Sequence, residues 1–173
     1  MSERPGAFDF AGQKARSRRL WDETGWEDLA CFIGPNAERF RGAWEATRAK
    51  TLGGRGGIAF AFCWPAFLFG FAWFLYRKMW TFGLLLLVLP VLLGFVFQSP
   101  GGSIGMAVAV SLFAKSLYVQ HALPQIEDAR AAGGGDEAVA AAGGVSIVGG
   151  AIGGAILAAG ASAAAYLFMT GGL

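Results

Sequence analysis

The sequence offers few side chains that could carry out catalysis or bind a metal ion. His121 is the only histidine, and no cysteine or carboxylate stands beside it to complete a metal site. A lone histidine can transfer protons in principle, but with Tyr118 three residues earlier we interpret it as a hydrogen-bonding residue at a membrane interface. We interpret Cys31 and Cys63 as two unpaired small apolar residues rather than a disulfide or a metal site.

Other signatures of catalysis and of phosphate binding are missing too. Ser103, Ser111 and Ser146 have no base partner at a recognisable spacing, so nothing supports a nucleophilic serine. The glycine-rich runs 53–57 and 101–102 lack the Lys-Ser/Thr ending of a phosphate-binding loop. We therefore predict a protein that is not an enzyme, with no catalytic residues, no metal ion and no cofactor.

A cluster of aromatic and basic residues is better suited to contact lipid. Trp and Tyr prefer the headgroup region of a bilayer, and Lys and Arg commonly flank membrane spans. Two interpretations remain open for Arg77 and Lys78: a clamp on lipid phosphates, or ordinary anchoring at the interface. The residues that we expect at the lipid headgroups or the interface are Trp64, Trp73, Tyr76, Arg77, Lys78, Trp80, Tyr118 and His121.

Small residues recur every four positions near the C-terminus. Such spacing places them in a row on one helix face, where another helix backbone can approach closely. The partner in that packing could be another helix of this chain or a second subunit, and the sequence does not distinguish the two. The predicted helix-packing residues are Gly149, Gly150, Gly153, Gly154, Ala158 and Ser162.

These groups belong to a chain with the composition of a membrane protein. Of its 173 residues 55% are hydrophobic and only 15% are charged, whereas soluble domains average about 25% charged residues. The mean hydropathy is +0.49, and the net charge of +2 is too small to indicate a nucleic-acid partner. The charges are also unevenly placed, because residues 1–57 contain ten of the 14 Lys and Arg residues.

The uneven charge divides the chain into three expected segments. We expect a flexible basic tail over 1–21, two cytoplasmic amphipathic helices and a glycine-rich joint over 22–57, and a membrane domain over 58–173. The two helices are predicted over 22–33 and from Asn36 to about residue 50. Their apolar side chains are expected to form a cytoplasmic interaction face, made of Trp26, Leu29, Ile33, Phe40 and Trp44.

The membrane domain contains four apolar stretches, and their flanking charges bear on the topology. They cover residues 58–76, 80–97, 104–119 and 145–169. If all four crossed the membrane, the four basic residues after residue 57 would lie outside. If 58–76 is re-entrant or interfacial, bent at Pro65 and Gly70, all 14 basic residues lie on the cytoplasmic side, as the positive-inside rule requires.

We therefore favour an all-α integral membrane protein with three transmembrane helices and one aromatic re-entrant or interfacial element. Four transmembrane helices are the alternative. On the favoured topology residues 98–102 form a periplasmic turn and residues 121–143 a cytoplasmic loop with a hinge at 133–135.

Three runs of residues resemble a known family. They are Phe32-Ile33-Gly34-Pro35-Asn36, Trp64-Pro65-Ala66-Phe67-Leu68-Phe69-Gly70 and, most specific, Trp73-Phe74-Leu75-Tyr76-Arg77-Lys78-Met79-Trp80. Their order resembles the domain-of-unknown-function family 2628, small bacterial membrane proteins, over about residues 31–147. The resemblance implies class and topology, and it implies no chemistry.

The function predicted from these observations is that of a non-enzymatic accessory or scaffold subunit of a membrane protein assembly. It would act through helix packing and lipid contacts, as a homo-oligomer or as part of a larger complex. A lipid-binding or membrane-shaping protein is the alternative, and a small channel or transporter is a third. We expect the bacterial cytoplasmic (inner) membrane, with several spans and a cytoplasmic N-terminus, and membrane lipids as partners.

Overall fold

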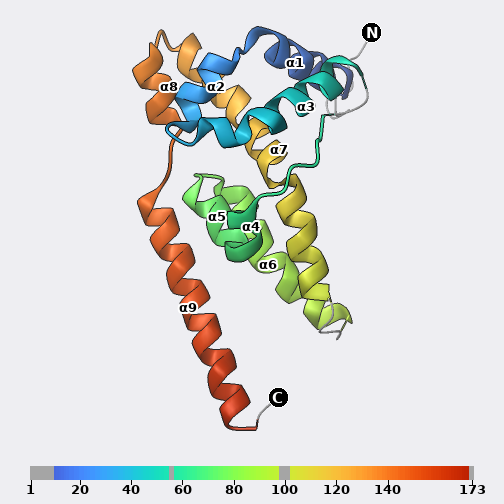
Figure 1. The fold of residues 1–173 in the computed structure, drawn as a ribbon, viewed down its shortest axis with the longest axis vertical. Coiled ribbons are helices and arrows are strands. Elements are labelled where there is room, and N and C mark those ends of the chain that lie inside the picture. Colours follow the sequence, from blue (N-terminus) through green and yellow to red (C-terminus); the bar gives the residue numbers. More distant parts are fainter. Residues whose placement is uncertain (1–9, 55–56, 98–101, 172–173) are drawn as a thin grey trace, which may run out of the picture.

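The structure is a computed structural model that describes residues 10–54, 57–97 and 102–171, and these residues are helical with no β-strand. This confirms the all-α prediction for the described part of the chain. Short helices form a cap at one end, from which three longer helices descend (Figure 1). In order they are α1 (Phe10–Glu23), α2 (Trp26–Ile33), the 3₁₀ turn η1 (Ala37–Phe40), α3 (Arg41–Leu52), α4 (Trp64–Phe69), α5 (Phe71–Tyr76), α6 (Trp80–Phe97), α7 (Gly102–Ala131), α8 (Asp136–Ala142) and α9 (Ile147–Met169).

The cap consists of α1, α2, η1, α3 and α8 packed around the upper part of α7 (Figure 1). Its centre is apolar and aromatic: the rings of Trp21 and Trp44 stack 4.8 Å apart, and those of Phe40 and Tyr118 lie 5.2 Å apart. Burial of these large rings supplies most of the favourable free energy for a cap made of short helices.

The predicted cytoplasmic interaction face requires a correction. Leu29, Ile33, Phe40 and Trp44 are at most 4% exposed, because they pack inside the protein's own core. Only Trp26 remains partly exposed, and the Arg41 guanidinium lies 5.2 Å from its ring centre. The amphipathic pattern correctly identified residues that become buried. Because α7 of the same chain covers these residues, they form no exposed interaction face.

The expected flexible tail is also different in the structure. Residues 1–9 lie outside the described residues, and from Phe10 onward the chain forms α1. Two basic side chains of α1 reach one acid on α7: Arg16 and Arg19 lie 2.8 and 2.5 Å from the Glu127 carboxylate. Local sequence patterns do not reveal a partner that is more than 100 residues away. Leu20 and Trp21, at the end of α1, are buried as well.

A third difference concerns residues 121–143, where we predicted a loop. Helix α7 instead continues to Ala131 through Pro124, and α8 follows after a turn in which Gly133 adopts a φ of 75°. An internal proline costs a helix about 3 kcal/mol. Buried contacts of α7 with the cap, by residues such as Leu123 and Ile126, offset that cost.

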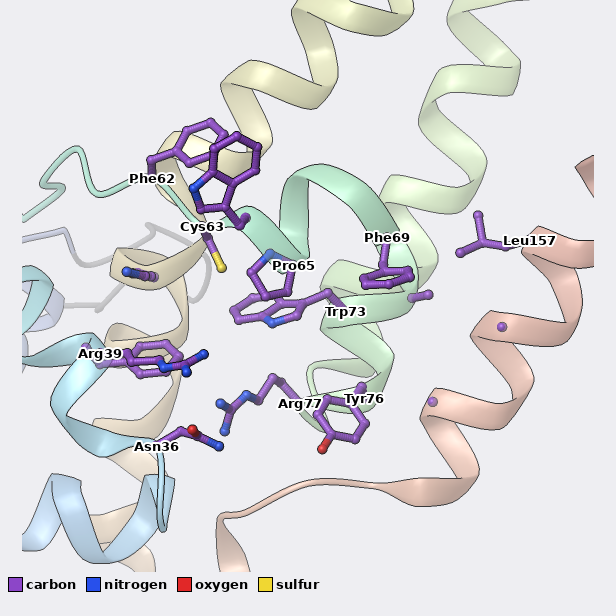
Figure 2. Close-up of a pocket in the computed structure, with 16 residues that line it drawn as sticks. Asn36, Arg39, Phe62, Cys63, Pro65, Phe69, Trp73, Tyr76, Arg77 and Leu157 are labelled. Carbon is purple, nitrogen blue, oxygen red and sulfur yellow. The ribbon is translucent and has the colours of Figure 1, made fainter.

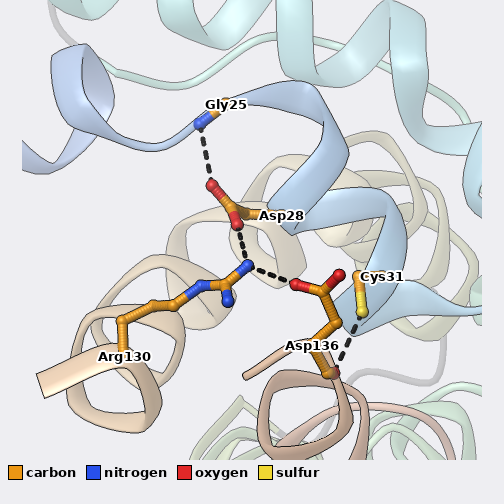
Figure 3. Close-up of polar contacts among 5 residues, drawn as sticks. All are labelled: Gly25, Asp28, Cys31, Arg130 and Asp136. Carbon is orange, nitrogen blue, oxygen red and sulfur yellow. Dashed lines mark hydrogen bonds and ion pairs between the residues drawn. The ribbon is translucent and has the colours of Figure 1, made fainter. Parts of the chain in front are cut away.

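One arginine ties the end of α7 to the cap (Figure 3). Arg130 lies 2.5 Å from the Asp28 carboxylate on α2 and 2.7 Å from that of Asp136 on α8. Asp28 also accepts a hydrogen bond from the Gly25 backbone N–H at 3.4 Å, and the Cys31 thiol donates to the Asp136 carbonyl at 3.2 Å. Each of these pairs is solvent-accessible and contributes at most about 1 kcal/mol, so they orient α2, α7 and α8 more than they stabilise them.

The aromatic stretch 58–76 does not form one long helix. Helices α4 and α5 have six residues each and rise about 9 Å, far less than the ~30 Å of a hydrocarbon core. Gly70 joins them with a φ of 49°, a conformation that favours glycine. The pair lies between α9 on one side and α6 and α7 on the other (Figure 1).

The segment 58–63 before α4 is extended and lies along α7. Its Ala61 and Cys63 N–H groups donate to the carbonyls of Leu112 and Ser111, at 2.9 and 3.0 Å. The Ser116 hydroxyl accepts from the Ala59 N–H at 3.1 Å and donates to the Ala59 carbonyl at 2.6 Å. Extended backbone packed against a helix needs such partners, because its buried polar groups are cut off from water.

Two helical runs of the described chain are long and apolar enough to cross a membrane. They are Gly105–Ala131, which is α7, and Asp136–Met169, which ends in α9. Helix α6 has 18 residues and follows α5 directly. The predicted periplasmic turn covers residues 98–102; residues 98–101 lie outside the described part of the chain, and Gly102 begins α7.

Candidate functional site: a cationic cavity between the cap and the long helices

A cavity of about 650 Å³ lies where the cap meets the long helices. Its walls come from η1, from the segment before α4, from α4 and α5, from α7 and from α9. Cavities of this size accommodate a small molecule or part of a lipid. Figure 2 shows that the lining is of two kinds, with Asn36, Arg39 and Arg77 at one end and Phe69 and Leu157 at the other.

The larger part of the wall is apolar. Phe62 comes from the extended segment before α4, Trp64 is the first residue of α4, Phe69 and Trp73 come from the α4–α5 pair, and Leu157 comes from α9. The rings of Phe62 and Trp64 meet edge to face with their centres 5.0 Å apart, which holds this wall in one arrangement. Such a surface suits an acyl chain or another apolar group.

The other end of the cavity carries three cations, from Arg39, Arg77 and Lys115. No Asp or Glu lines the cavity, and within the described residues none of these three cations forms an ion pair with a carboxylate. Cys63 lines it too, and burial raises the pKa of its thiol above the usual value, so this side chain adds no negative charge. The cavity therefore has a positive potential with nothing inside it to balance the charge.

Arg77 is the most deeply placed of the three cations. The residue is 8% exposed, and its guanidinium lies 5.1 Å from the ring centre of Phe40 and 5.0 Å from that of Tyr118. Its Nε atom and the Tyr118 hydroxyl have no hydrogen-bond partner among the described residues. Aromatic faces offset part of the cost of burying a charge, but they supply no opposite charge to balance it. A bound anion would supply that charge.

Local structure explains how Arg77 reaches this position. It directly follows the last residue of α5, and the next residue, Lys78, adopts a φ of 61° that turns the chain into α6. A positive charge is favourable at a helix C-terminus. Lys78 itself points elsewhere, since its ammonium donates to the Ala141 carbonyl at 3.0 Å.

The family described as "Protein of unknown function (DUF2628)" matches residues 37–126, which is more than half of the chain. The chain belongs to this family. None of the curated proteins and no solved structure matches the chain. The matched region runs from η1 to the upper part of α7, so it includes Arg39, Arg77 and Lys115 but not α9.

The structure brings together four of the eight predicted interface residues. Trp64, Trp73, Tyr76 and Arg77 all line the cavity. Tyr118 lies behind them, fully buried.

The other three predicted interface residues lie elsewhere. Lys78 contacts α8 through the hydrogen bond given above. Trp80 is 42% exposed at the first turn of α6, and the Gln125 amide donates to the ring Nε2 of His121 at 2.7 Å. His121 therefore makes a hydrogen bond, and its predicted place at a membrane interface stays a prediction.

The small residues of α9 divide into two groups. A Cβ on Gly149 would lie 2.3 Å from the Leu75 carbonyl oxygen, and one on Gly153 would lie 2.6 Å from the Ala72 Cβ, so these two glycines allow α9 to contact α5. A Cβ on Gly150 would lie 3.0 Å from the Tyr76 ring. The first turns of α9 therefore pack within this chain.

The second group of small residues contacts no other helix. Gly154 lines the cavity, and a Cβ there would meet nothing within 4 Å. Ala158 and Ser162 are exposed, as is every described residue of α9 beyond Leu157. The sequence did not distinguish packing against another helix of this chain from packing against a second subunit. For this second group of small residues the structure does not distinguish them either.

Several cavity residues have no sequence signature. Asn36, Arg39 and Lys115 are separated by up to 79 positions from one another and resemble ordinary surface polar residues in the sequence. The one indication in the sequence was the scarcity of charge after residue 57, which makes a lysine at position 115 of an apolar stretch unusual.

Proposed function

We propose that the protein crosses the bacterial inner membrane three times, with α6, α7 and α9 as spans and the cap in the cytoplasm. The α4–α5 pair would then enter the cytoplasmic leaflet and leave on the same side. In support, α6, α7 and α9 extend away from the cap on one side (Figure 1). The basic residues 77, 78 and 130 lie at the cap end of their helices, where the positive-inside rule expects them.

This topology predicts that the two ends of the chain lie on opposite sides of the membrane. A reporter active only outside the cytoplasm should give signal when fused after the C-terminus and none when fused to the N-terminus. A fusion at Gly134, between α7 and α8, is the matched internal control and should be silent. Signal at Gly134 with none after the C-terminus would contradict three spans and favour four.

For the activity, we propose that the protein is not an enzyme and binds an anionic amphiphile of the membrane. The observation that carries this proposal is the cavity: an apolar wall continuous with three cations, no carboxylate among its lining residues, and a buried arginine that no carboxylate of the described residues pairs with. An amphiphile with a negatively charged head satisfies both ends of such a cavity at once. A neutral apolar molecule would leave the cations unpaired, and a small inorganic anion would leave the aromatic wall empty.

Purification in a mild detergent followed by lipid analysis tests this proposal. We expect about one anionic lipid per chain to remain bound, enriched over its share of the membrane extract, because loss of the lipid would leave Arg77 without a counter-charge. A co-purified lipid mixture with the composition of the bulk extract would contradict the proposal.

A second candidate function, an accessory or scaffold subunit, is favoured by a different observation. Every described residue of the C-terminal half of α9 is exposed, Ala158 and Ser162 among them. Small residues on a spanning helix favour close packing with another helix. A stoichiometric protein partner in the same purification would support this candidate, and the lipid result does not depend on it.

A further inference from the structure

We infer that the ligand is a phosphate-bearing lipid that enters sideways from the cytoplasmic leaflet, through the space between the α4–α5 pair and α9. Its phosphate would lie at the end formed by Arg39, Arg77 and Lys115, and an acyl chain would lie against α9. This inference rests on the proposed binding function and adds the class of ligand and the route of entry.

The route follows from how α9 contacts its neighbours. One face of α9, with Gly149 and Gly153, touches α5 so closely that a Cβ has no room. The adjacent face, with Gly154 and Leu157, faces the cavity, and a Cβ on Gly154 would meet nothing within 4 Å. The cavity therefore continues along the surface of α9 instead of being closed by it. Since α9 is a membrane-spanning helix in the proposed topology, that opening faces lipid.

The phosphate follows from the charges. Three cations without a carboxylate suit a group that bears at least one full negative charge and several acceptor oxygens. A guanidinium donates to two phosphate oxygens at once, and an ammonium adds a further charge-assisted hydrogen bond. Arg77 lines the cavity and is more than nine-tenths buried without a carboxylate partner, so its guanidinium is the cation that such a headgroup would neutralise.

The depth of the three cations matches a headgroup that sits at the interface. Arg39 is exposed, Lys115 is half-buried and Arg77 is buried. The ammonium of Lys115 and the guanidinium of Arg77 lie 6.0 and 5.1 Å from the same ring, that of Phe40. The positive charge is therefore concentrated beside one aromatic ring, between the cap and the apolar wall. A lipid whose acyl chain lies against the apolar wall would have its charged headgroup at this position.

The test measures the binding of long-chain phosphatidic acid, of its dihexanoyl form and of inorganic phosphate by the purified full-length protein in detergent. The wild type should bind the long-chain lipid at least about tenfold more tightly than the dihexanoyl form, because buried methylene groups contribute to affinity. Equal binding of all three would show that the site takes a phosphate from water and would overturn the inference. No binding of any of the three would instead contradict the proposed function.

Two variants of α9 then test the route. Gly154→Phe places a ring in the open space beside the cavity and should weaken long-chain binding about tenfold, which is more than it weakens dihexanoyl binding, because the longer chain extends further along α9. Gly160→Phe is the matched control, since a Cβ there also meets nothing within 4 Å but the residue does not line the cavity. Long-chain binding by Gly154→Phe at the wild-type level would overturn the proposed route. The wild-type comparison of chain lengths decides the inference even if Gly154→Phe fails to fold.

Discussion

Gly149→Leu is expected to destabilise the protein by about 3 kcal/mol, the upper end of the usual cost of overpacking, because the neighbour cannot move. The neighbour here is backbone: the new Cβ would lie 2.3 Å from the carbonyl oxygen and 2.8 Å from the carbonyl carbon of Leu75. Helix α9 could accommodate the leucine side chain at position 149 only by moving away from α5. That movement would also open the cavity, whose walls include both helices.

Helix propensity acts in the opposite direction and does not decide the result. Leucine is favoured over glycine in a helix by somewhat under 1 kcal/mol, which is smaller than the steric cost. Gly160→Leu isolates the propensity effect, since nothing lies within 4 Å of a Cβ there. Thermal unfolding in detergent should therefore show a large loss for Gly149→Leu and no loss for Gly160→Leu. Equal unfolding temperatures for the two variants would contradict the α5–α9 contact.

Arg77→Met is expected to abolish most anionic-lipid binding while leaving the fold intact. Removing a charge-assisted hydrogen bond to a bound anion costs about 2 kcal/mol or more, equivalent to about a thirtyfold loss of affinity. The unliganded protein should not lose stability to the same extent, because a buried charge without a carboxylate partner is itself unfavourable. Methionine keeps the apolar length of the side chain against Phe40 and Tyr118.

The control for Arg77→Met is Arg48→Met. Arg48 also lies over an aromatic ring, 5.7 Å from the centre of Trp44, and its Nε donates to the Trp21 carbonyl at 3.0 Å. It does not line the cavity, so its loss should reduce stability and leave lipid affinity unchanged. Arg77→Lys should retain part of the affinity, because lysine keeps the charge but loses the two-pronged hydrogen bonding. If Arg77→Met bound anionic lipid as the wild type does, the cationic end of the cavity would not be the headgroup site.

Local patterns in the sequence predicted the elements whose signal is contained within one segment. The apolar run 145–169 corresponds to α9 at Ile147–Met169, and the helical spacing of Leu29 and Ile33 predicted α2. Pro65 and Gly70 marked the stretch that the structure breaks into α4 and α5. Each of these depends on periodicity, chain-breaking residues or the length of an apolar run, which are properties of neighbouring residues.

The features that the sequence did not reveal depend on partners far along the chain. Helix α1 is held by ion pairs to Glu127, and the upper part of α7 forms a helix through Pro124 because the cap covers it. The cavity combines Arg39, Lys115 and Leu157, which no spacing rule connects. Membership of the DUF2628 family does not supply the missing chemistry either, because the family description assigns none.

The most direct test of the proposed cavity is native mass spectrometry of the protein offered equal amounts of phosphatidic acid and phosphatidylcholine. We expect one phosphatidic acid per wild-type chain, little bound phosphatidylcholine, and loss of that preference in Arg77→Met but not in Arg48→Met. Equal retention of the two lipids by the wild type, or an unchanged preference in Arg77→Met, would contradict an anionic-lipid site between the cap and the long helices.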